Sequence, residues 1–571
     1  MRPSGRSGEL FDAFSRITAK VFAGDRLLSC PTLSKAPNYG QVLRRFVKKT
    51  PLRPLGPMRF LRLCIRYLCV NFAHIGFLAL SATFIRLIGW EVSSERFRNP
   101  EAPLLLIDSF AILPKIVQED RFQEAYLPGL AEEASRLGHD VLRFHRLYGS
   151  RHPVLLWKSL KILASGQDGL LEAHLFRPSD WGRLLWHVVS YPFALFRLVR
   201  SLRRYPPGSP ESYIREALIN TSGQCIAIGE ARRIAGLRLG LLLSSRPFVR
   251  SASQPGDQGM RIVSWYENQT VNKSLLRGLS QAEKTGGRHI PVLGAQLFLW
   301  PANLLNNHPD DAEAALGLAP DRVLVNGSYF LPEKTRQKYT VGPSLRYAEL
   351  FRDLPKELLT AGDLQETPQS TAMKKYSPED PEEQAPPHSS DRQNPEAFST
   401  DHSGVPPILA LLSYHPDEVR RVLQMLLPLA EQGTEITYKF HPATQPEHFS
   451  AWLPVSPIIA QGSLKTALQS IRYKKGAVLG SGSGSLAEAV AVGIPVLAVQ
   501  DPEPDLSLNY LPEYGKGLLW ESVEDAGDIK AALQKLTAAR GYPERPLLLR
   551  NFRELLFTEP TPERIGRDFC L

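Results

Sequence analysis

Gly480-Ser481-Gly482-Ser483-Gly484-Ser485-Leu486-Ala487-Glu488-Ala489 is the stretch of this chain that decides the fold. An apolar run, Gly476–Leu479, precedes it, and a Gly-Ile-Pro turn followed by the apolar run Val496–Val499 comes after it. Glycines allow backbone N–H groups to approach a ligand closely, a helix N-terminus favours an anion, and serine hydroxyls bond to phosphate oxygens. The stretch therefore predicts a strand–loop–helix–strand unit that binds the phosphate of a nucleotide or nucleotide-sugar.

Gly-Ser runs also occur as flexible linkers. Here the flanking strands and the turn place the run inside a folded unit, which favours the binding interpretation. The pattern is not a Walker loop, because no Gly-Lys-Ser/Thr ends it, and it lacks the acidic ribose partner of a dinucleotide fingerprint.

A second α/β element lies upstream of the Gly-Ser run. It comprises a predicted strand at Ile408–Ser413, a helix at Val419–Gln432 and a strand at Glu435–Pro442. The last strand ends in Lys-Phe-His-Pro, so Lys439 and His441 are expected beyond its carboxyl end, where open α/β sheets bind ligands. A Lys and a His near a leaving phosphate supply positive charge and a proton donor, although a lone His after a strand is often only structural.

These two motifs together resemble the C-terminal nucleotide-sugar domain of GT-B glycosyltransferases. They are most similar to the bacterial polysialyltransferase and capsule or lipopolysaccharide transferase group. The resemblance implies that His441, Pro442 and the loop serines hold the donor phosphate, and that Glu488 contacts the donor. The predicted donor-binding residues are Lys439, His441, Ser481, Gly482, Ser483, Gly484, Ser485 and Glu488.

Strand-like runs with polar ends alternate with helical segments in the middle of the chain, which predicts a parallel sheet. The runs cover residues 262–269, 290–296, 321–327 and 339–347. Their order resembles surface-carbohydrate biosynthesis proteins of the O-antigen type, and the whole resemblance covers residues 100–545. The implied fold class is α/β and GT-B-like, with two Rossmann-like domains facing a cleft and a basic, partly apolar N-terminal extension.

The 571 residues are enough for two large domains. Residues 361–405 are rich in Pro, Ser, Glu and Gln and predict a disordered linker. The expected organisation is an arm and apolar helical segment at 1–99, an N-terminal acceptor domain at 100–350, a nucleotide-sugar domain at 406–545 and a tail at 546–571. The segment 526–558 is expected to be helical and to pack back across the cleft.

The net charge of +10 is concentrated at the N-terminus, where residues 1–66 carry 14 Lys or Arg and 3 Asp or Glu. Nineteen residues without a charged side chain follow, Tyr67–Ile85, and Leu184–Arg204 mixes aromatic and basic residues as interfacial helices do. A span at Tyr67–Ile85 would export the body of the protein away from cytoplasmic nucleotide-sugars. We therefore expect peripheral contact with the cytoplasmic face of the inner membrane, and no nucleic acid partner.

The five cysteines are scattered, with neither zinc spacing nor a disulfide framework, so the expected location is the reducing cytoplasm. No secretory signal pattern begins the chain. GT-B enzymes usually bind no metal, because side chains and helix dipoles stabilise the leaving phosphate. We expect no metal site and no cofactor, the nucleotide-sugar being a substrate.

The resulting hypothesis is an inverting, metal-independent glycosyltransferase that moves a sugar from a nucleotide-sugar to a growing surface polysaccharide or a lipid-linked acceptor. A carboxylate of the N-terminal domain is expected to deprotonate the acceptor hydroxyl. Glu267 is the first candidate and Asp108 the second, although either residue can merely cap a loop. The catalytic candidates are thus Glu267, Asp108 and His441.

Two alternatives stay open at the level of the sequence. A nucleotide-sugar epimerase of the same fold has a similar loop and needs no acceptor. A non-catalytic polysaccharide-assembly protein would bind a nucleotide or glycan without turnover. The sequence does not identify the donor sugar, its nucleotide or the acceptor.

Overall fold

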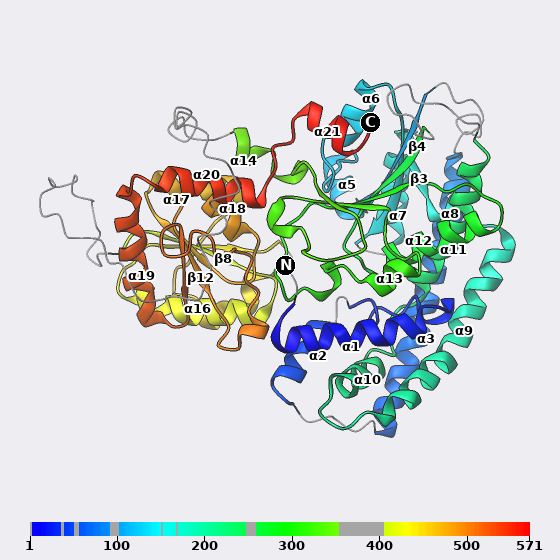
Figure 1. The fold of residues 1–571 in the computed structure, drawn as a ribbon, viewed down its shortest axis with the longest axis horizontal. Coiled ribbons are helices and arrows are strands. Elements are labelled where there is room, and N and C mark those ends of the chain that lie inside the picture. Colours follow the sequence, from blue (N-terminus) through cyan, green and yellow to red (C-terminus); the bar gives the residue numbers. More distant parts are fainter. Residues whose placement is uncertain are drawn as a thin grey trace, which may run out of the picture. The chain divides into compact units, whose positions relative to one another are not determined.

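The computed structural model describes residues 3–35, 39–50, 56–91, 102–149, 152–166, 169–246, 259–352, 405–442 and 444–571. The chain divides into two compact units (Figure 1). The first unit comprises Met1–Phe351, Asp501–Tyr510 and Arg553–Leu571, and the second comprises Arg352–Gln500 and Leu511–Phe552. The predicted linker at 361–405 lies outside the described residues, apart from its last residue.

A parallel sheet of seven described strands forms the centre of the first unit, in the order β3-β2-β1-β4-β5-β6-β7. The strands are β1 (Leu104–Ile112), β2 (Asp140–Tyr148), β3 (Gly169–Leu171), β4 (Met260–Trp265), β5 (Val292–Gln296), β6 (Arg322–Val325) and β7 (Tyr339–Val341). The central strands β1 and β4 are buried almost throughout, as expected for a parallel sheet that is covered on both faces.

The second unit is built on a parallel sheet of six described strands, in the order β10-β9-β8-β11-β12-β13. They are β8 (Ile408–Leu412), β9 (Ile436–Phe440), β10 (Ile458–Ile459), β11 (Ala477–Gly480), β12 (Val496–Val499) and β13 (Trp520–Val523). Each residue of β8, β11 and β12 is buried.

Both sheets have the strand order of the Rossmann fold, in which the chain moves outward from a central strand in one direction and then in the other. The direction changes between β1 and β4 in the first unit, and between β8 and β11 in the second. The expected fold class, an α/β protein with two Rossmann-like domains, is confirmed. The carboxyl ends of these four strands are where ligands of such sheets bind.

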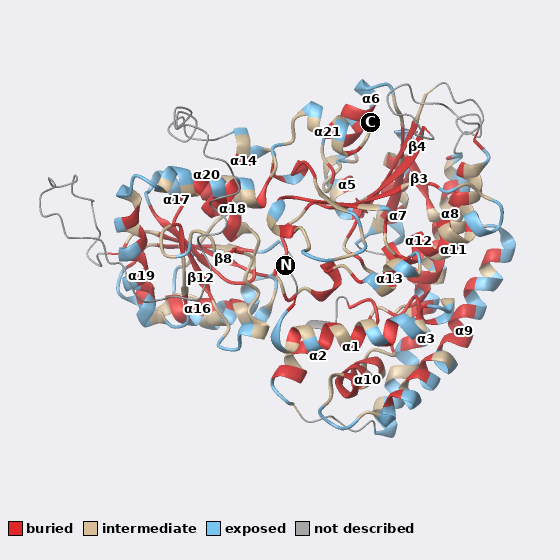
Figure 2. Ribbon diagram, viewed as in Figure 1, coloured by how far each residue is buried: buried red, intermediate tan, exposed pale blue. Residues whose placement is uncertain are grey.

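Helices pack around each sheet, and their buried faces are visible in Figure 2. Those of the first unit include α1 (Gly5–Val21), α2 (Tyr39–Val47), α3 (Pro57–Ile88), α5 (Leu113–Glu119), α6 (Leu130–Arg136), α7 (Pro153–Ser165), α8 (Glu172–Leu175), α9 (Pro178–Ser201), α10 (Pro210–Asn220), α11 (Ala227–Ser244), α12 (Thr270–Lys284), α13 (Asp311–Ala315) and α21 (Pro562–Asp568). Those of the second include α16 (Pro416–Glu431), α17 (Leu464–Tyr473), α18 (Ser485–Ala491) and α19 (Ala526–Ala538). Helix α20 (Arg545–Leu556) carries the chain from the second unit back to the first.

The N-terminal extension belongs to the first unit and does not stand apart from it as an arm. Leu10 and Phe14 of α1 are fully buried in a core that also holds residues of α9, α10 and α11. Lys35 Nζ lies 2.8 Å from the Asp310 carboxylate, and both side chains are buried. The extension therefore fills part of this core, and the charge of Lys35 is paired inside the folded unit.

Candidate functional site

The Gly-Ser loop lies at the switch point of the second sheet. It follows β11 and leads into α18. Ser481 is buried, whereas Ser483 and Ser485 are half-buried. The loop therefore starts beside β8 at the carboxyl end of the sheet, where its half-buried backbone and hydroxyl groups are available to a ligand.

Gly482 fixes the course of this loop. Its φ is +60°, in the left-handed region that favours glycine. A Cβ atom on Gly482 would lie only 1.9 Å from Oε2 of Glu418, in the first turn of α16. Ser413, directly after β8, donates a hydrogen bond of 3.0 Å to the same oxygen. The loop backbone thus packs against a polar group held by the neighbouring strand end.

His441 lies on the other side of β8. Its backbone N–H donates to the carbonyl of Leu412 at 3.1 Å, which anchors it to the end of β8. The ring of Tyr414 lies 5.6 Å from the His441 ring and 4.0 Å from the His415 ring, measured between centroids. Partial burial lowers the pKa of His441, so its imidazole is neutral at neutral pH and can donate one hydrogen bond.

The Lys439 side chain does not join His441 and Tyr414. Its ammonium group donates to the carbonyl of Gly462, which follows the edge strand β10, whereas the Gly-Ser loop follows β11 on the far side of β8. Glu488 lies one turn into α18 and is half-buried, with its backbone N–H bonded to the carbonyl of Gly484. His441 and the loop thus flank the end of β8 on its two sides, whereas the Lys439 ammonium group is bonded beyond the edge strand β10.

The residues that follow β8 were not predicted as part of the site. Ser413, Tyr414, His415 and Glu418 lie between the Gly-Ser loop and His441. A signal for them was present, because His415-Pro416 repeats the His441-Pro442 pair after the next strand. We call Ser413, Tyr414, His441 and the loop 481–485 the switch-point cluster.

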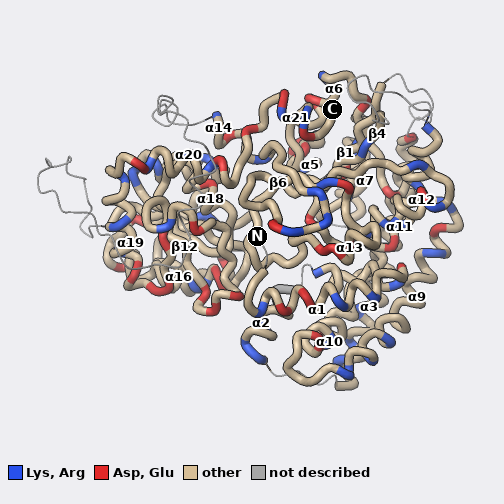
Figure 3. Tube along the Cα trace, viewed as in Figure 1, with Lys and Arg blue, Asp and Glu red and all other residues tan. Residues whose placement is uncertain are grey.

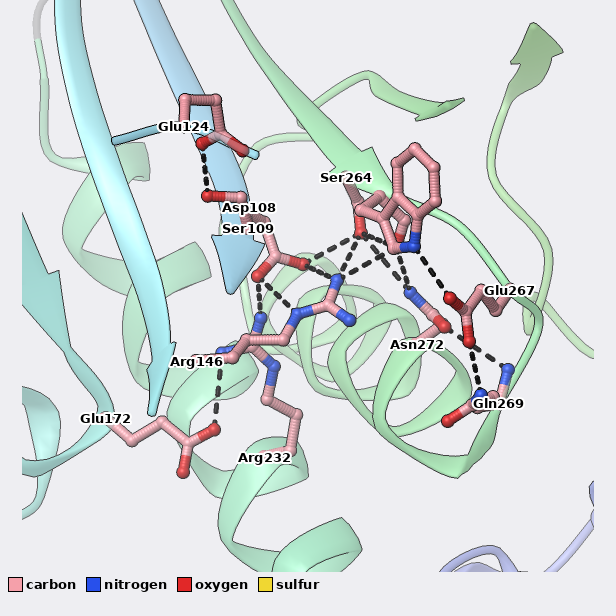
Figure 4. Close-up of polar contacts among 11 residues, drawn as sticks. Asp108, Ser109, Glu124, Arg146, Glu172, Arg232, Ser264, Glu267, Gln269 and Asn272 are labelled. Atoms are coloured by element: carbon pink, nitrogen blue, oxygen red, sulfur yellow. Dashed lines mark hydrogen bonds and ion pairs between the residues drawn. The ribbon is translucent and has the colours of Figure 1, made fainter. Parts of the chain in front are cut away.

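Glu267 lies at the switch point of the first sheet, two residues beyond β4. The indole N–H of Trp265 donates to Glu267 Oε1 at 2.8 Å, and Gln269 donates to Oε2 (Figure 4). Asn306 holds the Glu267 backbone carbonyl at 2.6 Å. This half-buried carboxylate is oriented by neutral donors, with no Lys or Arg ion pair in the described residues, which suits a proton acceptor.

Asp108 has a different environment from the one predicted. It lies within β1, which continues to Ile112, and it is fully buried. Its carboxylate accepts hydrogen bonds from Arg146 through both oxygens, from Arg232 and from Ser264 (Figure 4). Burial alone would raise the pKa of Asp108, but the two guanidinium groups outweigh it and lower the pKa to about 2.

Four donors therefore saturate the Asp108 carboxylate, two on each oxygen. Such a group has neither a free lone pair nor the basicity to deprotonate a hydroxyl. Its arginine partners link β1 to β2 and α11, so Asp108 organises the core of the first unit. This corrects the expectation that Asp108 is the second candidate base, and Glu267 stays as the predicted base.

A second carboxylate, Glu124, lies at the same edge of the first sheet and was not predicted. It accepts a hydrogen bond of 2.6 Å from Ser109 of β1 and bonds from the backbone N–H groups of Tyr126 and Leu127. The Tyr126 ring lies 4.7 Å from the Trp265 ring. These contacts give Glu124 the role of shaping the loop that covers Trp265.

Among the described ranges, no three His, Cys, Asp or Glu side chains gather as metal ligands would. The five cysteines, all in those ranges, are free.

No protein-family model matches this chain, and no curated protein matches it. Solved structures do resemble it, each over 82% of this chain. They include UDP-GlcNAc 2-epimerase from Neisseria meningitidis bound to UDP-GlcNAc (12% identity, 99% of that chain, TM-score 0.40) and MurG from Acinetobacter baumannii (10% identity, 100% of that chain, TM-score 0.37). The glycosyltransferase SnogD from Streptomyces nogalater is a third (14% identity, 99% of that chain, TM-score 0.34). Because these TM-scores are low, we rest the fold assignment on the two strand orders.

Proposed function

We propose that this chain is a nucleotide-sugar-dependent glycosyltransferase of the GT-B type. The observation that carries the proposal is the switch-point cluster, in which a Gly-Ser loop and a histidine follow the two strands that flank β8, at the carboxyl edge of a Rossmann strand order. The sheet of the first unit presents an oriented carboxylate, Glu267, at its own switch point. One unit thus offers a donor site and the other a base.

The donor phosphates bind at the switch-point cluster in this proposal. Backbone N–H groups and hydroxyls of residues 481–485 bond to phosphate oxygens, and the neutral His441 donates a hydrogen bond to the leaving phosphate. Glu488 contacts the donor from α18. Lys439 has no part in this arrangement, because its ammonium group is held at Gly462.

Glu267 accepts the proton of the acceptor hydroxyl as the sugar is transferred. One base and one group that stabilises the leaving phosphate suit a single displacement with inversion at the anomeric carbon. We propose that the reaction uses no metal and no cofactor, that it takes place in the cytoplasm, and that the acceptor is a growing surface polysaccharide or a lipid-linked glycan.

The first test measures the thermal shift of the full chain with CMP, UDP, GDP, ADP and NAD. The full chain is required because α1 contributes to the core of the first unit. We expect one nucleotide to stabilise the wild type, with the shift lost in His441→Ala and kept in His448→Ala. His448 is a matched control, being an exposed histidine of the same unit.

The second test follows transfer from the corresponding nucleotide-sugar to lipid-linked and oligosaccharide acceptors. Glu267→Gln should keep the thermal shift and lose at least about a hundredfold in the rate of transfer, the lower range for a general base. If NMR spectra show that the free nucleotide-sugar isomerises without an acceptor, the protein is an epimerase and the transferase proposal is wrong. Binding of a nucleotide without turnover of any nucleotide-sugar would favour the assembly protein.

A further inference from the structure

Two long helices of the first unit, α3 and α9, each bury one face and expose the other. The buried residues of α3 are Tyr67, Asn71, His74, Leu78, Ser81 and Ile85, and those of α9 include Leu184, Val188, Tyr191, Leu195 and Leu198. The helices touch where Tyr67 Oη donates to the carbonyl of Val188 at 2.6 Å and the Tyr67 ring stacks on Tyr191.

The exposed face of α3 is strongly apolar. Met58, Leu61, Ile65, Leu68 and Phe72 are 48–78% exposed and recur every three or four residues, which places them on one stripe. The exposed face of α9 repeats the pattern. Its stripe consists of Trp186, Val189, Phe193 and Phe196, which are 55–67% exposed. Monomeric soluble proteins rarely expose apolar patches of this extent unless the patch meets a partner.

The charges around the two stripes have one sign. Exposed arginines lie on α3 at Arg62 and Arg66, and at the end of α9 at Arg197 and Arg200. Figure 3 colours the Lys and Arg positions of the described chain blue. Arg203 and Arg204 follow in the next turn. Helix α3 contains no acidic residue, and the one acidic residue of α9, Asp180, is buried against Arg238. Each stripe is therefore apolar and is bordered by cationic side chains of its own helix.

A helix of this length and composition can also cross a bilayer, and α3 is the one helix in the described ranges that meets the criterion. Its buried face argues against a span. Asn71 Oδ1 accepts bonds of 2.9 Å from the backbone N–H groups of Ile226 and Ala227, where α11 begins, and Asn71 Nδ2 donates to Gln224. Withdrawal of α3 into a membrane would leave these groups without partners and open the core around Tyr67.

We propose that the exposed stripes of α3 and α9 form a docking face for the surface of a bilayer that contains anionic phospholipids. The apolar side chains enter the boundary between headgroups and acyl chains, with Trp186 at the interface, while the arginines bind lipid phosphates. A second copy of the chain is disfavoured as the occupant, because a two-fold symmetric contact would bring the like-charged margins together. The face does not depend on the proposed transferase activity.

The test is co-sedimentation of the full chain with vesicles of phosphatidylcholine alone or of phosphatidylcholine mixed with phosphatidylglycerol. We expect binding to the mixed vesicles that high salt releases, and little binding to phosphatidylcholine. Phe193→Ser with Phe196→Ser should weaken binding to the mixed vesicles by roughly tenfold or more, since each ring is removed from the interface. Arg197→Glu with Arg200→Glu should weaken it by a similar factor and reduce its salt dependence, with the other four arginines still in place.

The matched control is Val455→Ser with Tyr473→Ser, which removes two exposed apolar side chains from the second unit and should leave binding unchanged. All of these side chains are exposed, so the variants should fold as the wild type does. The proposal is overturned by failure of the wild type to bind mixed vesicles, by equal loss in the control, or by self-association that the α9 variants abolish. Resistance of the cellular protein to high-salt and alkaline extraction would instead establish that α3 spans the membrane.

Discussion

At the scale of single residues, Asp108 is a buried carboxylate whose charge the surrounding arginines require. Asp108→Asn removes the charge that compensates Arg146 and Arg232, both of which are buried. Removing one partner of a buried ion pair typically costs about 3–5 kcal/mol. We expect the free energy of unfolding of the first unit to fall by about that amount, measured by urea denaturation with hydrogen exchange of β1 as the probe.

The same residue gives a pH dependence of defined sign. The pKa of Asp108 is about 2 in the folded chain and about 3.9 when unfolded, so its stabilisation is complete above the unfolded value. It should decline as the pH falls from about 4 to about 2, and the Asn variant should lack this part of the acid response. A folded Asp108→Asn protein of wild-type stability but without turnover would contradict the structural role.

At the scale of the element, the loop between β11 and α18 depends on one glycine. Gly482→Ala places a side chain at φ +60°, which costs about 1–2 kcal/mol, and displaces Glu418 from Ser413. We expect a lower melting temperature and a loss of the nucleotide-induced shift. Gly541→Ala, in the same unit but outside the loop, is the control, because the φ of Gly541 is not left-handed and no atom lies within 4 Å of where its Cβ would be. Equal effects of the two substitutions would show that the left-handed conformation is not what shapes the site.

The contrast between His441 and Lys439 shows what the sequence can predict about an element. The position of β9, and hence of His441 beyond its end, follows from the apolar pattern and the His-Pro pair. The direction of the Lys439 side chain does not, because a long flexible chain leans toward whichever carbonyl the tertiary structure offers, here that of Gly462. Ser413 and Tyr414 were not predicted because the sequence does not give the strand order. Only that order shows that β8 borders the switch point.

At the scale of the whole molecule, both Rossmann-like units were predictable because alternating strands and helices leave few other topologies. The assignment of the two ends of the chain was not. Helix α1 and the last 19 residues, from Arg553, both belong to the first unit, although α1 lies in the basic extension and the last 19 residues follow the second sheet. Local pattern identifies their helices, but the core that each helix completes is formed by residues distant in sequence.

The C-terminal segment yields the last prediction. Phe569 is fully buried in a cluster with Leu105 and Ile107 of β1, and Arg261 holds its carbonyl at 3.1 Å. Phe569→Ala leaves a cavity in that core and should destabilise the first unit by about 3–5 kcal/mol. Amides of β1 and β4 should then exchange hydrogen faster, whereas those of β8 and β11 keep their wild-type rates. Leu547→Ala, at a half-exposed leucine of α20, is the control and should change neither sheet. Equal acceleration in both sheets would mean that the two units unfold as one, and the C-terminal segment would then stabilise the entire chain.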